Sequence, residues 1–205
     1  MMEEIAANLQ RIRERIERAA TRAGRDPAEI KLVAVTKTVD VETIRKGIEA
    51  GLRIIGENRV QEARAKFGRL GREMAGRRIE WHLVGHLQTN KVRHALEIFD
   101  FIHSLDSLRL ATAINEAALK MGKRVDVLVE VKVSEEETKY GIQPDEALEF
   151  ISATSKLEGL RVLGLMAMPP FFEEPERARP YFRKAFELAS LIREAAIPGV
   201  EMKYL

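Results

Sequence analysis

The alternation of short apolar runs with helical patterns constrains the fold of this chain most. Six runs predict strands, and a seventh strand is expected to begin near Glu201. The six are Leu32–Thr36, Arg53–Glu57, Glu80–Val84, Phe101–Leu105, Val125–Val133 and Leu160–Met168. Helical patterns fill the gaps between them. The sequence therefore predicts repeated βα units and a parallel sheet.

The helices are marked by apolar spacing and by signals at their ends. The first runs through Ile5, Leu9, Ile12 and Ile16 and is expected to stop at Gly24. The others are expected from Asp40 to Gly51, over Val60–Leu70, Asn90–Phe99 and Ser107–Met121, after Asp145, and over Glu176–Ala195. Asp40 is a candidate N-cap, as is either Asp106 or Ser107.

Two architectures are built from repeated βα units, an open doubly wound sheet and an eight-stranded barrel. No GxGxxG glycine pattern follows the first strand, so a (β/α)8 TIM-type barrel with an extra N-terminal helix is the better prediction. A barrel must close, because an open edge exposes unpaired backbone groups. Six strands and the start of a seventh do not complete one. We therefore expect residues 1–205 to be a single barrel domain that lacks its C-terminal strand, or an architecture that is not closed.

Composition narrows the class of protein. Of 205 residues, 45% are hydrophobic, and 34 basic residues nearly balance 32 acidic ones, so charge alone favours neither nucleic acid nor a membrane. The absence of cysteine excludes disulfides and thiolate chemistry. The acidic N-terminus has no apolar signal region, and no stretch is apolar enough to span a bilayer. These features predict a cytoplasmic protein.

Lys37 is the main candidate for chemistry. It closes the first strand pattern, and a buried strand delivers its last residue to the sheet edge where ligands bind in α/β folds. Partial desolvation there favours the neutral amine, which attacks carbonyl groups. The alternative is a solvated lysine at a strand end.

The other candidates have simpler alternatives. Asn58 follows the second strand and is either a ligand contact or a turn residue. His82 is either a ligand contact or a core histidine, and Met166 either lines a cofactor or packs in the core. The four histidines do not have the spacing of a metal site, and there is no P-loop or GxSxG elbow.

Five ordered segments resemble the pyridoxal phosphate homeostasis proteins, single-domain relatives of the alanine racemase N-terminal barrel. They are Leu32–Thr38, Gly56–Glu62, Trp81–Lys91, Lys139–Ile142 and Gly164–Pro169. The resemblance implies a (β/α)8-type barrel in which Lys37 holds pyridoxal 5′-phosphate as a Schiff base. It also implies that Asn58, His82 and Met166 line the cofactor pocket.

Two departures from the family matter. Arg59 stands where the family often has an aromatic residue, which would alter the rim of the pocket. The family's seventh strand continues into a Ser/Gly-rich turn, a helix and a final strand. The resemblance assigns phosphate binding, and the arginine that faces the pyridine nitrogen, to that part, which lies beyond Leu205.

Lys37 permits two functions. Racemases place a lysine and a tyrosine on opposite faces of the cofactor, and they borrow a second domain and a partner subunit. None of Tyr140, Tyr181 and Tyr204 is placed by a motif as an acid or base. We therefore expect a monomeric, non-catalytic carrier that holds pyridoxal phosphate and releases it to apo-enzymes. An amino-acid racemase that depends on pyridoxal phosphate is the alternative, and a barrel without a cofactor is a third reading.

Overall fold

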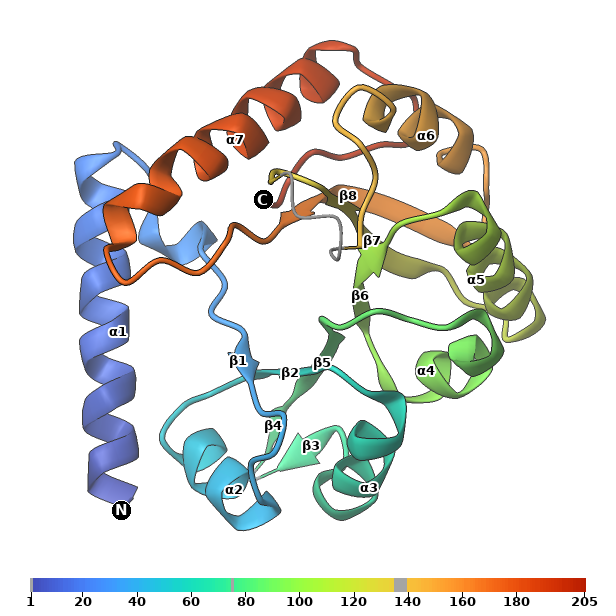
Figure 1. The fold of residues 1–205 in the computed structure, drawn as a ribbon. Coiled ribbons are helices and arrows are strands. Elements are labelled where there is room, and N and C mark those ends of the chain that lie inside the picture. Colours follow the sequence, from blue (N-terminus) through green and yellow to red (C-terminus); the bar gives the residue numbers. More distant parts are fainter. Residues whose placement is uncertain (1, 75, 135–139) are drawn as a thin grey trace. The chain divides into compact units, whose positions relative to one another are not determined.

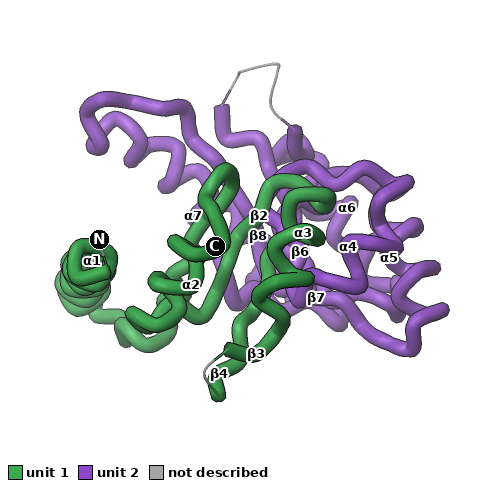
Figure 2. The backbone as a smooth tube through the Cα atoms, turned by 90° about the horizontal axis from the view of Figure 1, so that it is seen from below, with its two compact units in different colours: residues 1–82 green, residues 83–205 purple. Residues whose placement is uncertain are grey.

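The computed structural model describes residues 2–74, 76–134 and 140–205 (Figure 1). The chain divides into two compact units, Met1–His82 and Leu83–Leu205, which Figure 2 distinguishes by colour. Lys139, the first residue of the fourth motif, lies outside the described residues.

Unit 1 begins with a long helix and continues through alternating strands and helices. Its elements are α1 (Met2–Arg22), η1 (Pro27–Glu29), β1 (Ala34–Val35), α2 (Val41–Glu49), β2 (Ile54–Glu57), α3 (Val60–Leu70), β3 (Glu73–Met74), β4 (Arg77–Arg78) and β5 (Glu80–Leu83), the last reaching the unit boundary. β1 and β2 are parallel, with Val35 opposite Gly56. The strand order is β1–β2–β5.

Unit 2 repeats the same alternation. Its elements are η2 (Thr89–Lys91), α4 (Val92–Ile98), β6 (Phe101–Leu105), α5 (Leu108–Lys120), β7 (Val125–Val131), α6 (Ala147–Thr154), β8 (Leu160–Ala167), η3 (Pro175–Ala178) and α7 (Arg179–Glu194). β6, β7 and β8 are parallel and adjacent in that order. After α7, Tyr204 forms a parallel bridge with Gly164. The strand expected near Glu201 is therefore present as a short pairing beside β8.

In both units the strand order follows the order of the chain. A doubly wound sheet reverses its strand order at a switch point, whereas a barrel adds each new strand beside the last. Neither β1–β2–β5 nor β6–β7–β8 contains such a reversal. The topology within each unit thus favours the barrel over the doubly wound alternative.

Most elements match the sequence prediction, and the differences have physical reasons. α3 spans Val60–Leu70 as predicted, and Asp40 caps α2 by accepting from Thr43 N. Ser107, not Asp106, caps α5. β1 is shorter than the predicted Leu32–Thr36, and the hairpin β3–β4 was not predicted, because strands of two residues show no alternation.

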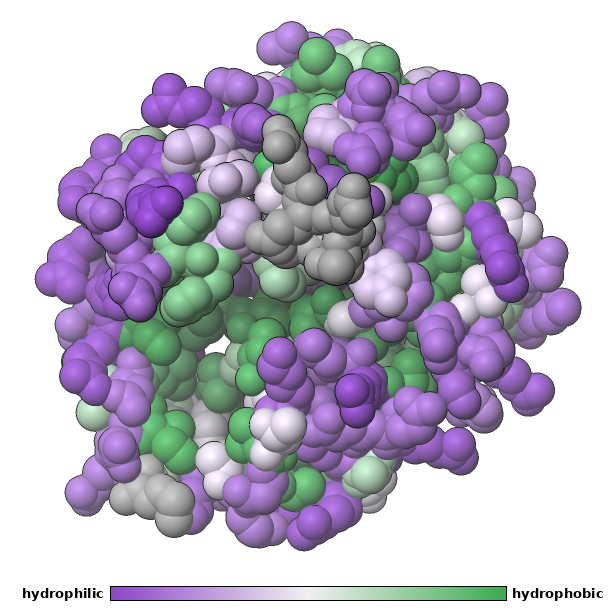
Figure 3. Space-filling model, in the orientation of Figure 1, coloured by the Kyte–Doolittle hydropathy of each residue, from purple (hydrophilic) through white to green (hydrophobic). Residues whose placement is uncertain are grey.

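Apolar packing attaches helices to strands within each unit. In unit 1, Phe67 of α3 meets Trp81 of β5 edge to face at 5.4 Å, and Trp81 is fully buried. In unit 2, Val127 and Val129 of β7 are also fully buried. Hydrophilic side chains dominate the visible surface of α1 (Figure 3). None of the described helices is long and apolar enough to cross a membrane.

Candidate functional site

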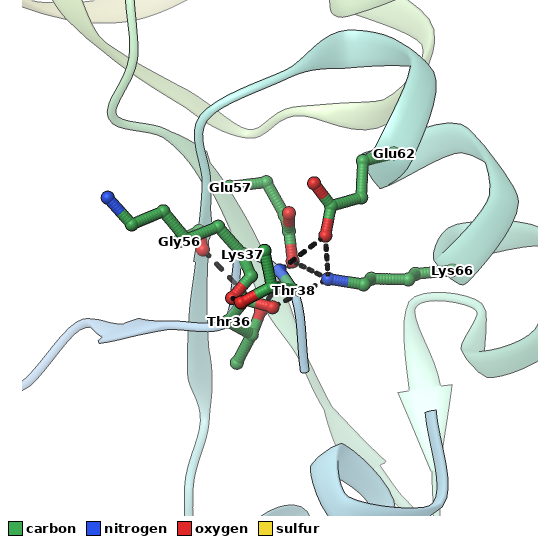
Figure 4. A network of polar contacts seen from close by, with 7 residues as sticks. All are labelled: Thr36, Lys37, Thr38, Gly56, Glu57, Glu62 and Lys66. Atoms are coloured by element: carbon green, nitrogen blue, oxygen red, sulfur yellow. Dashed lines mark hydrogen bonds and ion pairs between the residues drawn. The ribbon is translucent and has the colours of Figure 1, made fainter. Parts of the chain in front are cut away.

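The carboxyl end of β1 carries Lys37 on a backbone that is tied to β2. Thr36 N–H donates to Gly56 O at 2.9 Å, which continues the parallel pairing by one residue. Thr36 is buried, and its Oγ1 donates to Glu57 Oε1 at 2.5 Å. The Lys37 side chain points away from the side chains of Glu57, Glu62 and Lys66 (Figure 4). It is exposed.

Lys37 lies in a tight turn with an unusual backbone. Val39 N–H donates to Thr36 O at 3.0 Å and closes the turn. The third residue of the turn, Thr38, has φ of 63°, a left-handed conformation that β-branched residues rarely adopt. Such a residue costs about 1–3 kcal/mol and persists only where its surroundings hold it. Thr38 Oγ1 donates to Lys37 O at 2.6 Å.

A largely buried ion network, formed by side chains of α3 and β2, lies beside this turn (Figure 4). Lys66 Nζ donates to Thr36 O at 2.6 Å and to Oε1 of both Glu57 and Glu62 at 2.7 Å. The side chain of Glu57 is fully buried and that of Lys66 is 8% exposed. Glu62 Oε1 also accepts from Thr38 N–H at 2.7 Å. The turn and the helix are thus joined through charged hydrogen bonds, which are the stronger kind.

The network shifts the titration of its members. Burial lowers the pKa of Lys66, but the hydrogen bonds to Glu57 and Glu62 outweigh it and leave the pKa raised. The hydrogen bond from Lys66, together with that from Thr38 N–H, lowers the pKa of Glu62. Lys66 is therefore a fixed ammonium group around neutral pH. It is not a second reactive amine.

The two other candidates in unit 1 lie in a strand or directly after one. Trp81 contacts α3, so its neighbour His82 points to the opposite face. His82 is buried, and its Nε2 lies 3.4 Å from Glu80 Oε2. Asn58 follows Glu57, whose side chain faces α3, and is half-buried. Lys37 and Asn58 thus follow the carboxyl ends of the neighbouring strands β1 and β2, and His82 lies within β5, the next strand of the sheet.

Met166 belongs to unit 2. It lies in β8 opposite Glu130 of β7 and packs against the buried cluster of Phe101, Leu128 and Leu163. Its surroundings within that unit are those of a partly buried core residue. Its role in lining a cofactor stays a prediction.

A second group of titratable side chains gathers at the carboxyl ends of β6 and β7 in unit 2. His86 Nδ1 lies 3.1 Å from Asp106 Oδ2, and the ring of Tyr140 stacks on His86 at 3.9 Å. Burial, with a smaller contribution from the charge of Asp106, raises the pKa of Glu130 to about 7. Within residues 2–74, 76–134 and 140–205, no group of three His, Asp or Glu residues could hold a metal ion.

Sequence reasoning did not single out Lys66, Glu62 or Glu130. A signal existed for one pair, because Glu62 and Lys66 are four residues apart on a predicted helix. Their link to Thr36 and Thr38 depends on tertiary packing and had no sequence signal.

Comparison with known proteins defines the class first. The family described as alanine racemase, N-terminal domain, matches residues 7–203. Alanine racemase of Clostridium difficile has a TM-score of 0.68 at 18% identity and covers 82% of this chain and 44% of its own, a likeness of fold alone. The fold is therefore that of the α/β, TIM-type barrel of the racemase N-terminal domain, as the sequence predicted.

Closer relatives define the family within that class. The pyridoxal phosphate homeostasis protein of Aquifex aeolicus is 45% identical over 197 residues, which cover 95% of this chain and 85% of the relative. That of Escherichia coli strain K12 is 41% identical over 203 residues, 99% of this chain and 83% of the relative. The structure of PipY from Synechococcus elongatus with PLP bound has a TM-score of 0.76 at 31% identity and covers 91% of this chain and 85% of its own. The chain belongs to the pyridoxal phosphate homeostasis protein family.

Proposed function

We propose that this chain binds pyridoxal 5′-phosphate covalently through Lys37 and acts in the homeostasis of that cofactor. One observation carries the proposal. Among the residues that the structure describes, the Lys37 amine has no hydrogen bond or ion pair, while the peptide groups on both sides of Lys37 are held. An exposed, uncommitted amine on a fixed backbone suits condensation with an aldehyde.

Pyridoxal phosphate supplies that aldehyde, with which a primary amine condenses reversibly with loss of water. The neutral amine of Lys37 is the attacking group. Asn58 follows β2 and His82 lies in β5, the two strands that come after β1 in the sheet, and we assign both residues to contacts with the ring. Met166 is assigned to the pocket from the family resemblance. The relatives' names and the ligand of PipY support the same cofactor.

We further propose a carrier that passes the cofactor to apo-enzymes, not a racemase. Racemisation needs a second acid or base opposite the lysine. Of the tyrosines, Tyr140 stacks on His86 and Tyr204 packs against the Phe101 cluster. Tyr181 stacks on Phe172. All three rings already have partners in unit 2. A monomer in the cytoplasm is part of the same proposal.

Covalent loading is tested by adding pyridoxal phosphate to the purified protein, reducing with borohydride and mapping the adduct by peptide mass. We expect an absorbance band near that of a protonated Schiff base and an adduct on Lys37, both absent in Lys37→Ala. Arg59→Ala, on the rim, is the matched control and should still form the adduct. An adduct on another lysine in the wild type would contradict the assignment.

Carrier function is tested separately. The loaded protein should leave the optical rotation of L-alanine unchanged and restore activity to an apo-enzyme that depends on pyridoxal phosphate. Loss of optical activity that disappears in Lys37→Ala would instead establish the racemase.

A further inference from the structure

One helix holds the peptide groups on both sides of Lys37. On the N-terminal side, Lys66 Nζ donates to Thr36 O at 2.6 Å. On the C-terminal side, Glu62 Oε1 accepts from Thr38 N–H at 2.7 Å. Glu62 and Lys66 lie four residues apart on α3, and Lys66 Nζ also forms an ion pair with Glu62 Oε1 at 2.7 Å. Two neighbouring side chains of α3 thus form hydrogen bonds with the backbone immediately before and after the proposed reactive residue (Figure 4).

The turn needs such support. Thr38 has φ of 63°, a conformation that glycine adopts without steric cost but that strains a β-branched residue. The bond to Glu62 fixes the N–H of this strained residue. Without that bond, Thr38 can relax toward negative φ, which would change the direction of the Lys37 peptide.

The network itself is poorly suited to adding net stability. Glu57 and Lys66 are buried, and such a pair repays the cost of desolvation only when all its oxygens and protons are hydrogen-bonded. Lys66 uses its three N–H groups, but the second oxygen of Glu57, Oε2, is buried without a hydrogen-bond partner among the described residues. This points to a role in fixing geometry.

We propose that Glu62 and Lys66 are positioning residues for Lys37. They hold the strained turn so that the Lys37 amine is presented in one direction, on the opposite side of the backbone from the ion network (Figure 4). This inference rests on the proposed function. In the step concerned, the Lys37 nitrogen attacks the aldehyde carbon, a C=N bond forms, and the aldehyde oxygen leaves as water. Lys66 does not compete, because its N–H groups are engaged.

The decisive variant is Glu62→Ala, because Glu62 is partly exposed and its loss leaves the Lys66–Glu57 pair in place. We expect apparent affinity for pyridoxal phosphate, read from the Lys37 absorbance band, to fall roughly tenfold, the size of one charge-assisted hydrogen bond. Hydrogen exchange at the Thr38 amide should accelerate in the same variant, with or without cofactor. Gln61→Ala, the exposed neighbour on α3, is the matched control and should change neither readout.

Two further variants separate positioning from a loss of fold. Glu62→Gln retains an oxygen that can accept from Thr38 N–H and should keep affinity within about threefold of the wild type. Thr38→Gly in the Glu62→Ala background should recover most of the affinity, because glycine takes a positive φ without help.

The outcomes are distinct from those of the proposed function. A wild type that forms no Lys37 adduct contradicts the proposed function and this inference together. A wild type that forms the adduct, with Glu62→Ala binding equally well despite faster Thr38 exchange, overturns only the inference. Reduced affinity that Thr38→Gly fails to recover also overturns it, since the loss would then not arise from the strained turn.

Discussion

Thr38 illustrates what a sequence conceals at the scale of a residue. A glycine or asparagine in a sequence indicates a possible positive φ, but a threonine does not. Nothing in the run Thr36–Val39 therefore predicts a turn that contains a strained residue. Lys37 itself could be predicted, because it closes an apolar run. Its neighbours' contacts could not, because Glu62 and Lys66 reach them from another element.

Glu62 should make the stability of the fold sensitive to acid. Its folded-state pKa is lowered from 4.5, so its contribution to the free energy of unfolding is present above 4.5 and is lost as pH falls through the folded value. As pH is lowered below 4.5, the free energy of unfolding measured with urea should therefore fall more steeply for the wild type than for Glu62→Gln. Parallel pH profiles for the two proteins would contradict the assignment.

Glu130 should make the fold less stable as pH rises, whereas Glu62 makes it less stable as pH falls. Its folded-state pKa is raised from 4.5 to about 7, first by burial and then by the charge of Asp106. The folded state then favours the protonated form, so the contribution of Glu130 to the free energy of unfolding is fully present below pH 4.5 and is lost as pH rises toward 7. Glu130→Gln should remove this decline and gain stability over the wild type at pH 8.

Thermal unfolding of the wild type and of Glu130→Gln, followed from below pH 4.5 to pH 8, measures the loss of stability caused by Glu130. The exposed Glu149 on α6 offers a matched control, and Glu149→Gln should track the wild type at every pH. A constant difference between wild type and Glu130→Gln across the range would show that Glu130 titrates normally.

At the scale of elements, α3 joins structure to the proposed chemistry. It packs on β5 through Phe67 and sends Lys66 to the end of β1. Removing only the cation should leave Glu57 charged and buried, so Lys66→Met should destabilise the fold by about 3–5 kcal/mol. Urea denaturation measures the change.

The double variant makes this prediction specific. Glu57→Gln in the Lys66→Met background removes the stranded charge and should recover part of the loss. Arg64→Met, exposed on the same helix, should stay within about 0.5 kcal/mol of the wild type. A double variant no more stable than Lys66→Met would mean that the buried carboxylate is not the cause.

The sequence predicted these elements to different degrees. α3 was predicted residue for residue, because its apolar spacing persists over several turns. The first strand was predicted as Leu32–Thr36 but spans Ala34–Val35, because Leu32 and Val33 share its apolar character without belonging to its register with β2. The role of α3 at the site was not predicted, since a helix pattern specifies which face is apolar and not which backbone its polar groups reach.

At the scale of the molecule, strand order carries the most information. The alternation of runs predicted a βα architecture and left two closures open, and the unbroken order within each unit favours the barrel. Closure could not be derived from the residues, because the runs specify strands and not their partners. The family match over residues 7–203 supplies the fold class independently.

The segment after α7 pairs with β8 at a glycine, and we expect that glycine to determine where the segment joins the sheet. Tyr204 pairs with Gly164, and Leu165 N–H donates to Tyr204 O at 3.1 Å. A Cβ at Gly164 would lie 1.8 Å from Tyr204 O, and φ there is 148°. Gly164→Ala should therefore force the Tyr204 strand away from β8 and lower the free energy of unfolding by at least about 1–3 kcal/mol.

Hydrogen exchange locates that loss. In Gly164→Ala, the amides of Leu165 and Tyr204, which both bond across this pairing, should exchange faster, while Val127 in β7 changes least. Gly68→Ala in α3, where an added Cβ meets nothing within 4 Å, is the control and should gain about 0.5–1 kcal/mol. Unchanged protection at Leu165 and Tyr204 would mean that the pairing tolerates a side chain, and that glycine at this position does not determine where the strand after α7 is added to the sheet.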